Sequence, residues 1–283
     1  MDEPVTEWVP GTPAPALAPF VDAYCGYRLT GFAPGIHRGV PSRHLTFIVG
    51  IDRPIDVVAQ TDSAQRPERY GCVLSGLQAS PALIEHDGEQ EGVAIELSPL
   101  GVRALFGMPA RELWNRSYEL ADVVGAPGRE LWERLHETRD WTARFAVCDD
   151  VLTPLVRGEL VVPELRQAWT DLVAAGGGLS VEELSARTGW SRQHLTRRFR
   201  DEFGLGPKVA ARVIRFERAR RMLLGTPSFV SIAQVAAVCG YYDQAHLDRD
   251  FAAFAGCTPS QMVREEVPHF QDEEPLERAS SGA

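Results

Sequence analysis

The chain has 283 residues, of which 44% are hydrophobic and 24% are charged, and its formal net charge is −10. This composition is typical of a globular protein, and the length allows two domains that each have their own core. No apolar run approaches the roughly 20 residues of a membrane helix, and the acidic start MDEPVTEW is unlike a signal peptide. We therefore expect a cytoplasmic protein without a membrane partner. The five cysteines lack C-x-x-C spacing, which argues against both a disulfide framework and a zinc site.

Residues 1–158 are predicted to form an α+β domain that is rich in strands. Residues 1–35 are rich in proline, alanine and glycine, and the first clear β-prone run, LTFIVGI, begins at Leu45. The runs IDVVAQ, YGCVLSGL, ALIEH and VAIEL follow it. The dipeptide Asp87-Gly88 separates the last two runs, and such a dipeptide predicts a β-hairpin.

Helices are expected after these strands. Pro99 suits the first position of a helix, and Gly107 suits its end. A further helical pattern extends from Arg129 to about Leu155. The residues alone therefore predict strands backed by helices.

Functional candidates are few in this domain. The histidines His37, His44 and His86 form no H-x-H pair, so we expect no metal ion and no cofactor. The chain contains no G-x-S-x-G, P-loop or dinucleotide-binding pattern, so we predict no catalytic residue and no enzyme. Arg43 and His44 are candidates for binding an anionic effector; the alternative is that they are surface or structural residues.

Residues 159–163 are predicted to be a linker, residues 164–266 a second domain, and residues 267–283 a disordered tail, because that tail is polar and acidic. The first helix of the second domain should end at the glycine run Gly176–Gly178. Ser180-x-x-Glu183 and Ser231-x-x-Gln234 are capping boxes that predict two further helix starts. A longer helix is predicted from Pro207 to about Leu224.

The second domain contains a repeat. The stretch from residue 184 to 207 resembles the stretch from 235 to 259. Four of its positions, Leu195, Phe199, Gly204 and Pro207, recur 52 residues later as Leu247, Phe251, Gly256 and Pro259. Each copy is predicted to be two helices joined by a tight turn, so the domain should contain two helix-turn-helix units.

The second helix of the first copy is amphipathic. Its apolar residues Leu195, Phe199 and Phe203 recur every four positions and form one stripe. Its polar residues gather on the opposite face, where arginine and glutamine side chains can hydrogen-bond base edges in a major groove. The alternative is an ordinary amphipathic helix whose arginines are solvated, but the duplicated frame favours DNA binding.

Three motifs resemble the AraC/XylS family of transcription regulators: SRQHLTRRFRDEFGLGP, RFERARRMLL and IAQVAAVCGYYDQAHLDRDFAAFAGCTP. The resemblance covers about Glu164 to Glu266. It implies a DNA-binding domain of two helix-turn-helix units joined by a long helix, and it suggests a cupin-like or partial-barrel arrangement for the N-terminal domain. By position, it assigns DNA binding to Arg192, Gln193, Thr196, Arg197 and Arg200 in the first unit and to Gln244, Ala245, His246, Asp248 and Arg249 in the second.

The two units differ in charge. Residues 187–221 contain 11 basic and 3 acidic residues, a net charge of +8, whereas residues 231–266 contain 2 arginines and 5 carboxylates, a net charge of −3. Because Asp243, Asp248 and Asp250 make the second unit acidic, we expect the first unit to supply most of the affinity for DNA. The second unit should add orientation and some sequence preference.

The sequence thus predicts a one-component, sequence-specific transcription regulator, either an activator or a repressor. Its expected partner is double-stranded promoter DNA; RNA polymerase, a small-molecule effector and a second copy of the chain are further candidates. One alternative is a DNA-targeted enzyme whose N-terminal chemistry is not visible in the sequence. Another is an N-terminal domain that serves only as an interaction module.

Overall fold

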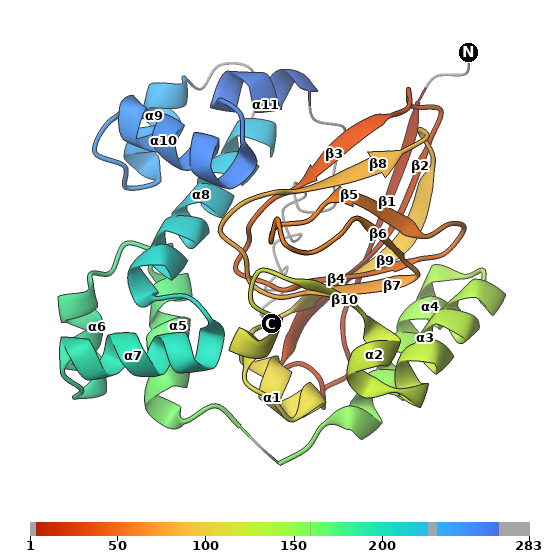
Figure 1. Cartoon of the computed structure of the whole chain (residues 1–283), viewed down its shortest axis with the longest axis horizontal. Coiled ribbons are helices and arrows are strands. Elements are labelled where there is room, and N and C mark those ends of the chain that lie inside the picture. The colour runs from red at the N-terminus through yellow and green to blue at the C-terminus, as the bar shows by residue number, and fades with distance from the viewer. Residues whose placement is uncertain (1–3, 159, 226–230, 266–283) are drawn as a thin grey trace, which may run out of the picture.

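The computed structural model of the chain describes residues 4–158, 160–225 and 231–265. Figure 1 shows two parts, a strand-rich N-terminal region (residues 4–158) and a helical C-terminal region (residues 160–265). This arrangement confirms the predicted fold class. The predicted tail, residues 267–283, lies outside the described residues.

The described strands form two antiparallel sheets. In the larger sheet the order is β1 (Val5–Gly11), β2 (Val21–Thr30), β9 (Gln90–Leu97), β4 (Thr46–Gly50), β7 (Cys72–Ser75) and β10 (Ser117–Glu119). In the smaller sheet it is β3 (Gly35–Gly39), β8 (Ala82–His86), β5 (Ile55–Ala59) and β6 (Glu68–Tyr70). Residues of both sheets line one cavity, so the sheets face each other across it, as a partial barrel would.

The predicted hairpin at Asp87-Gly88 is wrong. The strand before it, β8, pairs with β3 and β5, whereas the strand after it, β9, pairs with β2 and β4. The turn therefore carries the chain from one sheet to the other. Gly88 has a φ of +100°, and a Cβ atom there would lie 1.9 Å from the carbonyl oxygen of Phe32. Glycine is thus required by this crossing between the sheets.

Three strands, β1, β2 and β3, lie before Leu45, where the sequence pattern indicated no strand. The largest of them, β2, pairs with β1 on one side and β9 on the other. Glycines on two of these strands accept large side chains from a helix: Phe145 packs over Gly11, and Trp141 packs over Gly26. Composition therefore masked strands whose glycines make room for a covering helix.

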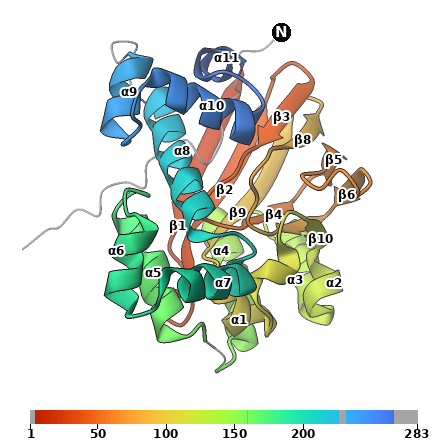
Figure 2. The same cartoon turned by 60° about the vertical axis from the view of Figure 1, so that its left-hand side comes forward.

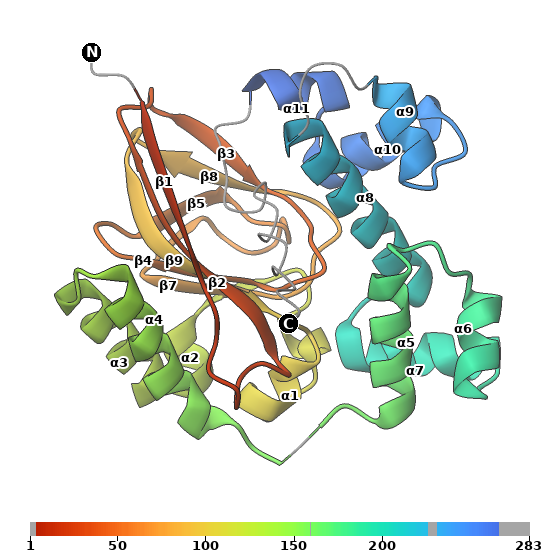
Figure 3. The same ribbon diagram turned by 180° about the vertical axis from the view of Figure 1, so that it is seen from behind.

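The helices of the N-terminal region are α1 (Gly101–Phe106), η1 (Ala110–Leu113), α2 (Leu120–Val124), α3 (Ala126–Glu137), α4 (Trp141–Leu152) and η2 (Thr153–Leu155). As predicted, Gly107 ends α1, in a left-handed conformation. Figure 3 shows α3 and α4 against the outer side of the larger sheet. The N-cap of α4 is Asp140, whose side chain accepts a hydrogen bond from the backbone of Ala143 at 2.8 Å.

The helices of the C-terminal region are α5 (Pro163–Ala174), α6 (Val181–Thr188), α7 (Arg192–Phe203), α8 (Pro207–Gly225), α9 (Ile232–Val238), α10 (Gln244–Ala255) and α11 (Pro259–Glu265). We call α6 and α7 the first unit and α9 and α10 the second unit. The long helix α8 joins them and is visible along its length in Figure 2. In the described part of the chain, no helix combines the length and apolar character needed to cross a membrane.

The two regions share apolar contacts. One buried cluster contains Leu105 and Leu113 of the N-terminal region together with Leu165 and Phe203 of the C-terminal region. A second cluster belongs to α8, α9, α10, α11 and the turns between them, except for Val40, which comes from the connection between β3 and β4. Each helix-turn-helix unit is therefore packed against a different part of the N-terminal region.

Candidate nucleic-acid interface

The first unit is built around two capped helices. At α6 the Ser180 hydroxyl accepts from the backbone of Glu183, and the Ser180 backbone donates to the Glu183 carboxylate at 2.7 Å, which is the predicted capping box. Gly189 ends α6 with a φ of +72°, and Ser191 then caps α7. These caps fix the sharp turn between the helices, because they satisfy backbone groups that a helix end leaves unpaired.

Helix α7 has one buried face and one exposed face. Leu195, Phe199 and Phe203 are fully buried, and the indole of Trp169 in α5 packs on both phenylalanine rings, with ring centroids 5.9 and 5.0 Å apart. Of the predicted DNA-binding residues of this helix, Arg192, Gln193, Arg197 and Arg200 are exposed, and Thr196 is partly buried beside them. The apolar stripe thus holds α7 from behind and leaves its polar face open to solvent.

Arg192 forms an ion pair within the first unit. Its guanidinium contacts the carboxylate of Glu182 on α6, and both side chains are well exposed. The hydrogen bond from Arg192 lowers the pKa of Glu182. In the DNA-free protein a carboxylate therefore competes with phosphate for this arginine.

We expect Glu182→Gln to raise the affinity for DNA by about two- to fivefold, because an exposed ion pair is worth less than about 1 kcal/mol. The change removes a negative charge from the first unit and frees Arg192. A salt titration of binding, compared with the exposed Glu133→Gln in α3, measures the effect. An equal gain in the Glu133 variant would assign it to net charge and not to Arg192.

The second unit repeats this construction. The Ser231 hydroxyl accepts from the backbone of Gln234, and the Ser231 backbone donates to the Gln234 side chain at 2.8 Å, as the second capping box predicts. Asp243 caps α10 by accepting from the backbone of His246 at 2.7 Å. Behind α10, the ring of Phe216 in α8 meets the edge of Phe251 at a centroid distance of 4.9 Å.

The acidic character expected of α10 is only partly exposed. Asp250 is 1% exposed and accepts hydrogen bonds of 3.0 and 2.6 Å from the guanidinium of Arg212 on α8. The charge of Asp250 is thus paired inside the protein, and the carboxylate of Asp243 is engaged as a helix cap. Of the three aspartates, Asp248 alone belongs to the predicted contact face. The pattern of α10 alone could not show this pairing, because Arg212 and Asp250 are 38 positions apart in the chain.

The predicted contact face of α10 is smaller than that of α7. Gln244, Ala245 and Arg249 are exposed, whereas His246 and Asp248 are partly buried. The ring of His246 packs edge-on against Tyr241 at 5.1 Å. The structure therefore brings all five residues to the start of one helix, where side chains enter a groove in helix-turn-helix proteins.

Helix α8 sets the separation of the two units. Its 19 residues correspond to a length of about 28 Å at 1.5 Å per residue, close to the pitch of about 34 Å between successive major grooves. Arg215, in the middle of α8, donates to the carbonyl of Gly177 at 2.8 Å and lies 5.7 Å from the ring centre of Tyr241. One side chain thus joins the loop before the first unit to the turn of the second.

Two further exposed residues near the predicted contact faces were not among the predicted site residues. Tyr242, in the turn before α10, is 93% exposed, and Lys208 at the start of α8 is also exposed. Tyr242 occupies the extra turn position of the second copy, so the one-residue difference between the copies was its sequence signal. No local sequence pattern indicated that Arg212 would pair with the buried Asp250.

Arg43 and His44 lie where the N-terminal region contacts α8, away from the cavity between the sheets. The backbone of Arg43 donates to Glu217 at 2.9 Å. His44 is 9% exposed, and its Nε2 lies 2.7 Å from the carboxylate of Asp22. Both contacts are consistent with the structural alternative, and effector binding by these residues stays a prediction.

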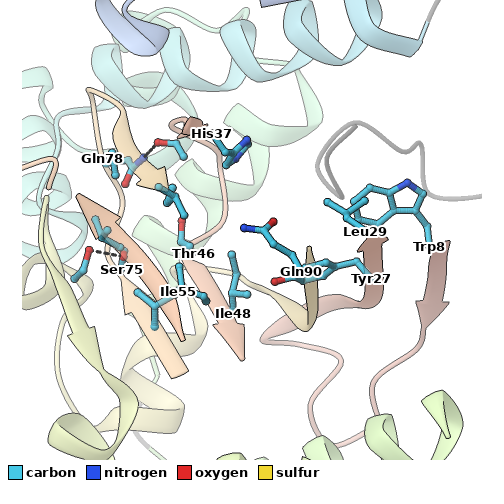
Figure 4. A pocket seen from close by; sticks show the side chains of 16 residues that line it. Trp8, Tyr27, Leu29, His37, Thr46, Ile48, Ile55, Ser75, Gln78 and Gln90 are labelled. Atoms are coloured by element: carbon cyan, nitrogen blue, oxygen red, sulfur yellow. Dashed lines mark hydrogen bonds between the residues drawn. The ribbon is translucent and has the colours of Figure 1, made fainter. Parts of the chain in front are cut away.

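The cavity between the sheets is lined by apolar and neutral polar side chains (Figure 4). Its volume is about 60 Å³, and Tyr27, Ile48 and Ile84 contribute apolar walls. Gln90 and Thr46 offer hydrogen-bonding groups. No aspartate, glutamate, lysine or arginine is among the described residues that line it. Elsewhere in the described ranges, no three His, Cys, Asp or Glu side chains are grouped so that they could hold a metal ion.

His37 also lines this cavity. Burial, and then the charge of Arg220, lower the pKa of His37 to about 3. In the unfolded chain a histidine binds a proton near pH 6.5, so protonation favours the unfolded state. The contribution of neutral His37 to stability is complete above pH 6.5 and is lost as the pH falls towards 3.

We therefore expect the wild-type protein to lose about 1–2 kcal/mol more stability than His37→Gln between pH 7.5 and pH 5. Urea unfolding at both pH values measures the difference. Parallel pH dependence in the two proteins would show that His37 is not held neutral.

Comparison with known proteins adds two family matches. A model described as a helix-turn-helix domain matches residues 184–265, which cover most of the first unit and all of the second. A model described as a domain of unknown function (DUF6597) matches residues 11–119, within the N-terminal region. The HTH-type transcriptional regulator Rv1931c of Mycobacterium tuberculosis is 37% identical over 87 residues, which are 31% of this chain and 33% of that protein. The match therefore spans about a third of that relative's length.

Residues 184–265 therefore form a helix-turn-helix domain of the AraC type. The helix-turn-helix match falls on the part of the chain that carries the three motifs. A probable AraC family transcriptional regulator from Rhodopseudomonas palustris is 24% identical, with 38% of this chain and 100% of that one covered and a TM-score of 0.35.

The whole fold of this chain is similar to that of ToxT from Vibrio cholerae O395. The TM-score is 0.50 and the identity 12%, with 85% of this chain and 96% of ToxT covered. At this identity the likeness concerns the fold alone. It includes the strand-rich N-terminal part as well as the helical part.

Proposed function

We propose that the chain is a one-component, sequence-specific transcription regulator that binds double-stranded promoter DNA. The observation that carries the proposal is the repeated presentation of a polar helix face, on α7 and again on α10, by helices held from behind. The relative Rv1931c, described as a transcriptional regulator, supports it. Residues 1–158 are proposed as a regulatory domain, 159–163 as a linker and 164–266 as the DNA-binding domain.

Base reading in the first unit is proposed for Gln193, Thr196 and Arg197, with phosphate contacts from Arg192 and Arg200. These side chains carry three positive charges to one exposed face, and arginines neutralise phosphates and release counterions. In the second unit Gln244, Ala245, His246, Asp248 and Arg249 are proposed to add orientation and sequence preference. Most of the affinity is therefore assigned to α7.

The N-terminal region is proposed to sense a small molecule in the cavity between the sheets. Because the described lining is uncharged and His37 is neutral, the cavity favours an uncharged, mostly apolar molecule that hydrogen-bonds Gln90 or Thr46. A volume of about 60 Å³ is less than half of the roughly 150 Å³ of a cavity that binds benzene, so it suits a molecule smaller than a single ring. ToxT has been solved with (E)-4-(8-methylnaphthalen-1-yl)but-3-enoic acid bound, so a small molecule can be held by a protein of this fold.

Further partners are proposed from the family. RNA polymerase would be contacted at promoters, and a second copy of the chain would allow paired DNA sites. The proposed location is the cytoplasm, where promoter DNA is accessible.

The proposal is tested by selecting DNA from a random pool with the full chain and titrating the binding of the selected site with salt. Enrichment of one sequence, with affinity that falls steeply as salt rises, is the expected result. Each phosphate contact adds about 0.9 to the slope of log affinity against log salt. Weak binding without enrichment would contradict sequence-specific regulation.

A further inference from the structure

The N-terminal region contacts the C-terminal end of each recognition helix. A Cβ atom on Gly204, which ends α7, would lie 2.6 Å from Cβ of Trp114. A Cβ atom on Gly256, which ends α10, would lie 3.8 Å from Cγ of Pro81. The repeated glycine thus marks two contacts with the N-terminal region of the chain. The first halves of α7 and α10, which carry most of the predicted DNA-binding residues, remain accessible to solvent.

The first unit is attached away from the cavity. The Nε atom of Arg103 in α1 donates to both oxygens of Glu202 in α7, at 2.7 and 2.9 Å. Trp114, at the end of η1, packs against Gly204 at the end of the same helix. None of these three residues lines the cavity, and Figures 1 and 2 show α7 beside α1.

The second unit is attached through Val40 and its neighbours. Val40 is 2% exposed and lies in the buried cluster that includes Phe216, Phe251 and Phe254. Ala79, from the connection between β7 and β8, packs on the same cluster. Every other buried member of that cluster belongs to the C-terminal region, so Val40 of the N-terminal region packs into the core of the C-terminal region.

This attachment directly continues the cavity wall. Gly39 and Gln78, which line the cavity, immediately precede Val40 and Ala79 in the chain. The side chain of Gln78 donates to the carbonyl of Gly39 at 2.8 Å. Gly39 is also paired with Ala82 across β3 and β8, and Ala82 lines the cavity too. A displacement of this wall therefore also moves the backbone of Val40.

We propose that the cavity regulates the second unit and not the first: a molecule that fills it displaces the wall at Gly39, and Val40 carries that displacement into the core that holds α10. Close-packed interiors transmit such shifts because they contain little free volume. The ion pair of Arg103 meanwhile keeps α7 in place. The inference rests on the proposed function, since it gives the sensing cavity its output on DNA.

The test is hydrogen exchange of the full, DNA-free chain in four variants. Val40→Ala should make the amides of α9 and α10 exchange about fivefold faster and leave α6 and α7 unchanged, because it removes two buried methyl groups from the second core. Arg103→Ala is the matched control, and it should speed exchange in the first unit alone.

Ala82→Leu stands in for a bound molecule, because its larger side chain fills the cavity beside Gly39. It should change exchange in α9 and α10, whereas the double variant with Val40→Ala should exchange like Val40→Ala alone. If the Ala82→Leu variant does not fold, the Gln78→Ala variant is used in its place. Gln78→Ala alters the same wall, because it removes the hydrogen bond from the Gln78 side chain to the carbonyl of Gly39. The coupling is overturned if the cavity variant alters both units equally, alters neither, or acts undiminished without Val40.

DNA binding gives a separate readout. On a selected site, Ala82→Leu should change discrimination at the bases read by α10 and leave those read by α7 unchanged. If the full chain selects no DNA, the proposed function is wrong, while the exchange result still decides the coupling.

Discussion

Phe199→Ala is expected to destabilise the protein by about 3–5 kcal/mol, the usual cost of truncating a buried aromatic side chain. Phe199 is fully buried in the first unit, 5.9 Å from the ring centre of Trp169 and 4.6 Å from that of Phe203. Removing it leaves a cavity behind the recognition helix. Urea unfolding followed by circular dichroism measures the loss.

Arg200→Ala, one residue further along α7, is the control for this prediction. Its side chain is exposed, so the substitution should change stability by no more than about 0.5 kcal/mol. Phe251→Ala, at the matching position of the second unit, should cost about as much as Phe199→Ala, since Phe251 is also fully buried. A loss below about 1 kcal/mol for both phenylalanines would show that the repeated frame is not a repeated core.

Arg197→Ala is expected to weaken binding to a selected DNA site by about 1–3 kcal/mol, or roughly 5- to 150-fold, and to relax the preference at one base pair. Arg197 is exposed on the polar face of α7, and an arginine there can hydrogen-bond guanine through two nitrogens. Thermal stability should be unchanged. Titrations with the selected site and with single-base variants of it measure both effects.

Arg249→Ala tests the assignment of most affinity to the first unit. Arg249 is exposed on α10, and its Nε donates to the carbonyl of Ala245 at 3.1 Å. We expect a smaller loss than for Arg197→Ala, because α10 presents fewer positive charges. A larger loss for Arg249→Ala would reverse the roles of the two helices.

The helical region followed closely from the sequence because its determinants are local. Leucine and phenylalanine four residues apart predicted the buried stripe of α7, and Ser180 and Ser231 marked helix starts that the structure has. Gly204 and Gly256 end α7 and α10, and each has a left-handed backbone conformation, which glycine adopts at little cost. The repeat reinforced each of these signals.

The strand-rich region followed less well because pairing between strands is not local. The segment before Leu45 contains three strands, yet its glycines and prolines obscured the alternating pattern. Asp87-Gly88 has the residues of a hairpin turn, but β8 and β9 find their partners in different sheets. Turn chemistry constrains the local backbone and does not choose the strand that pairs next.

In the candidate site, too, local features could be predicted from the sequence and contacts between distant residues could not. The exposed residues of α7 and α10 could be placed on helix faces from their spacing. The pairing of Asp250 with Arg212 and the insertion of Val40 into the second core could not, because each joins residues far apart in the chain. Both contacts bear on the second unit: one pairs an aspartate of α10 with α8, and the other attaches the unit to the N-terminal region.

A hydroxyl-radical footprint of the full chain on its selected DNA tests most directly whether both units read DNA. Two protected segments on one face of the duplex, centred about 10 base pairs apart, are expected, since α8 separates the recognition helices by about one turn of DNA. Arg197→Ala should reduce the protection of one segment more than the protection of the other. A single protected segment, or uniform protection along the fragment, would contradict recognition by two helix-turn-helix units.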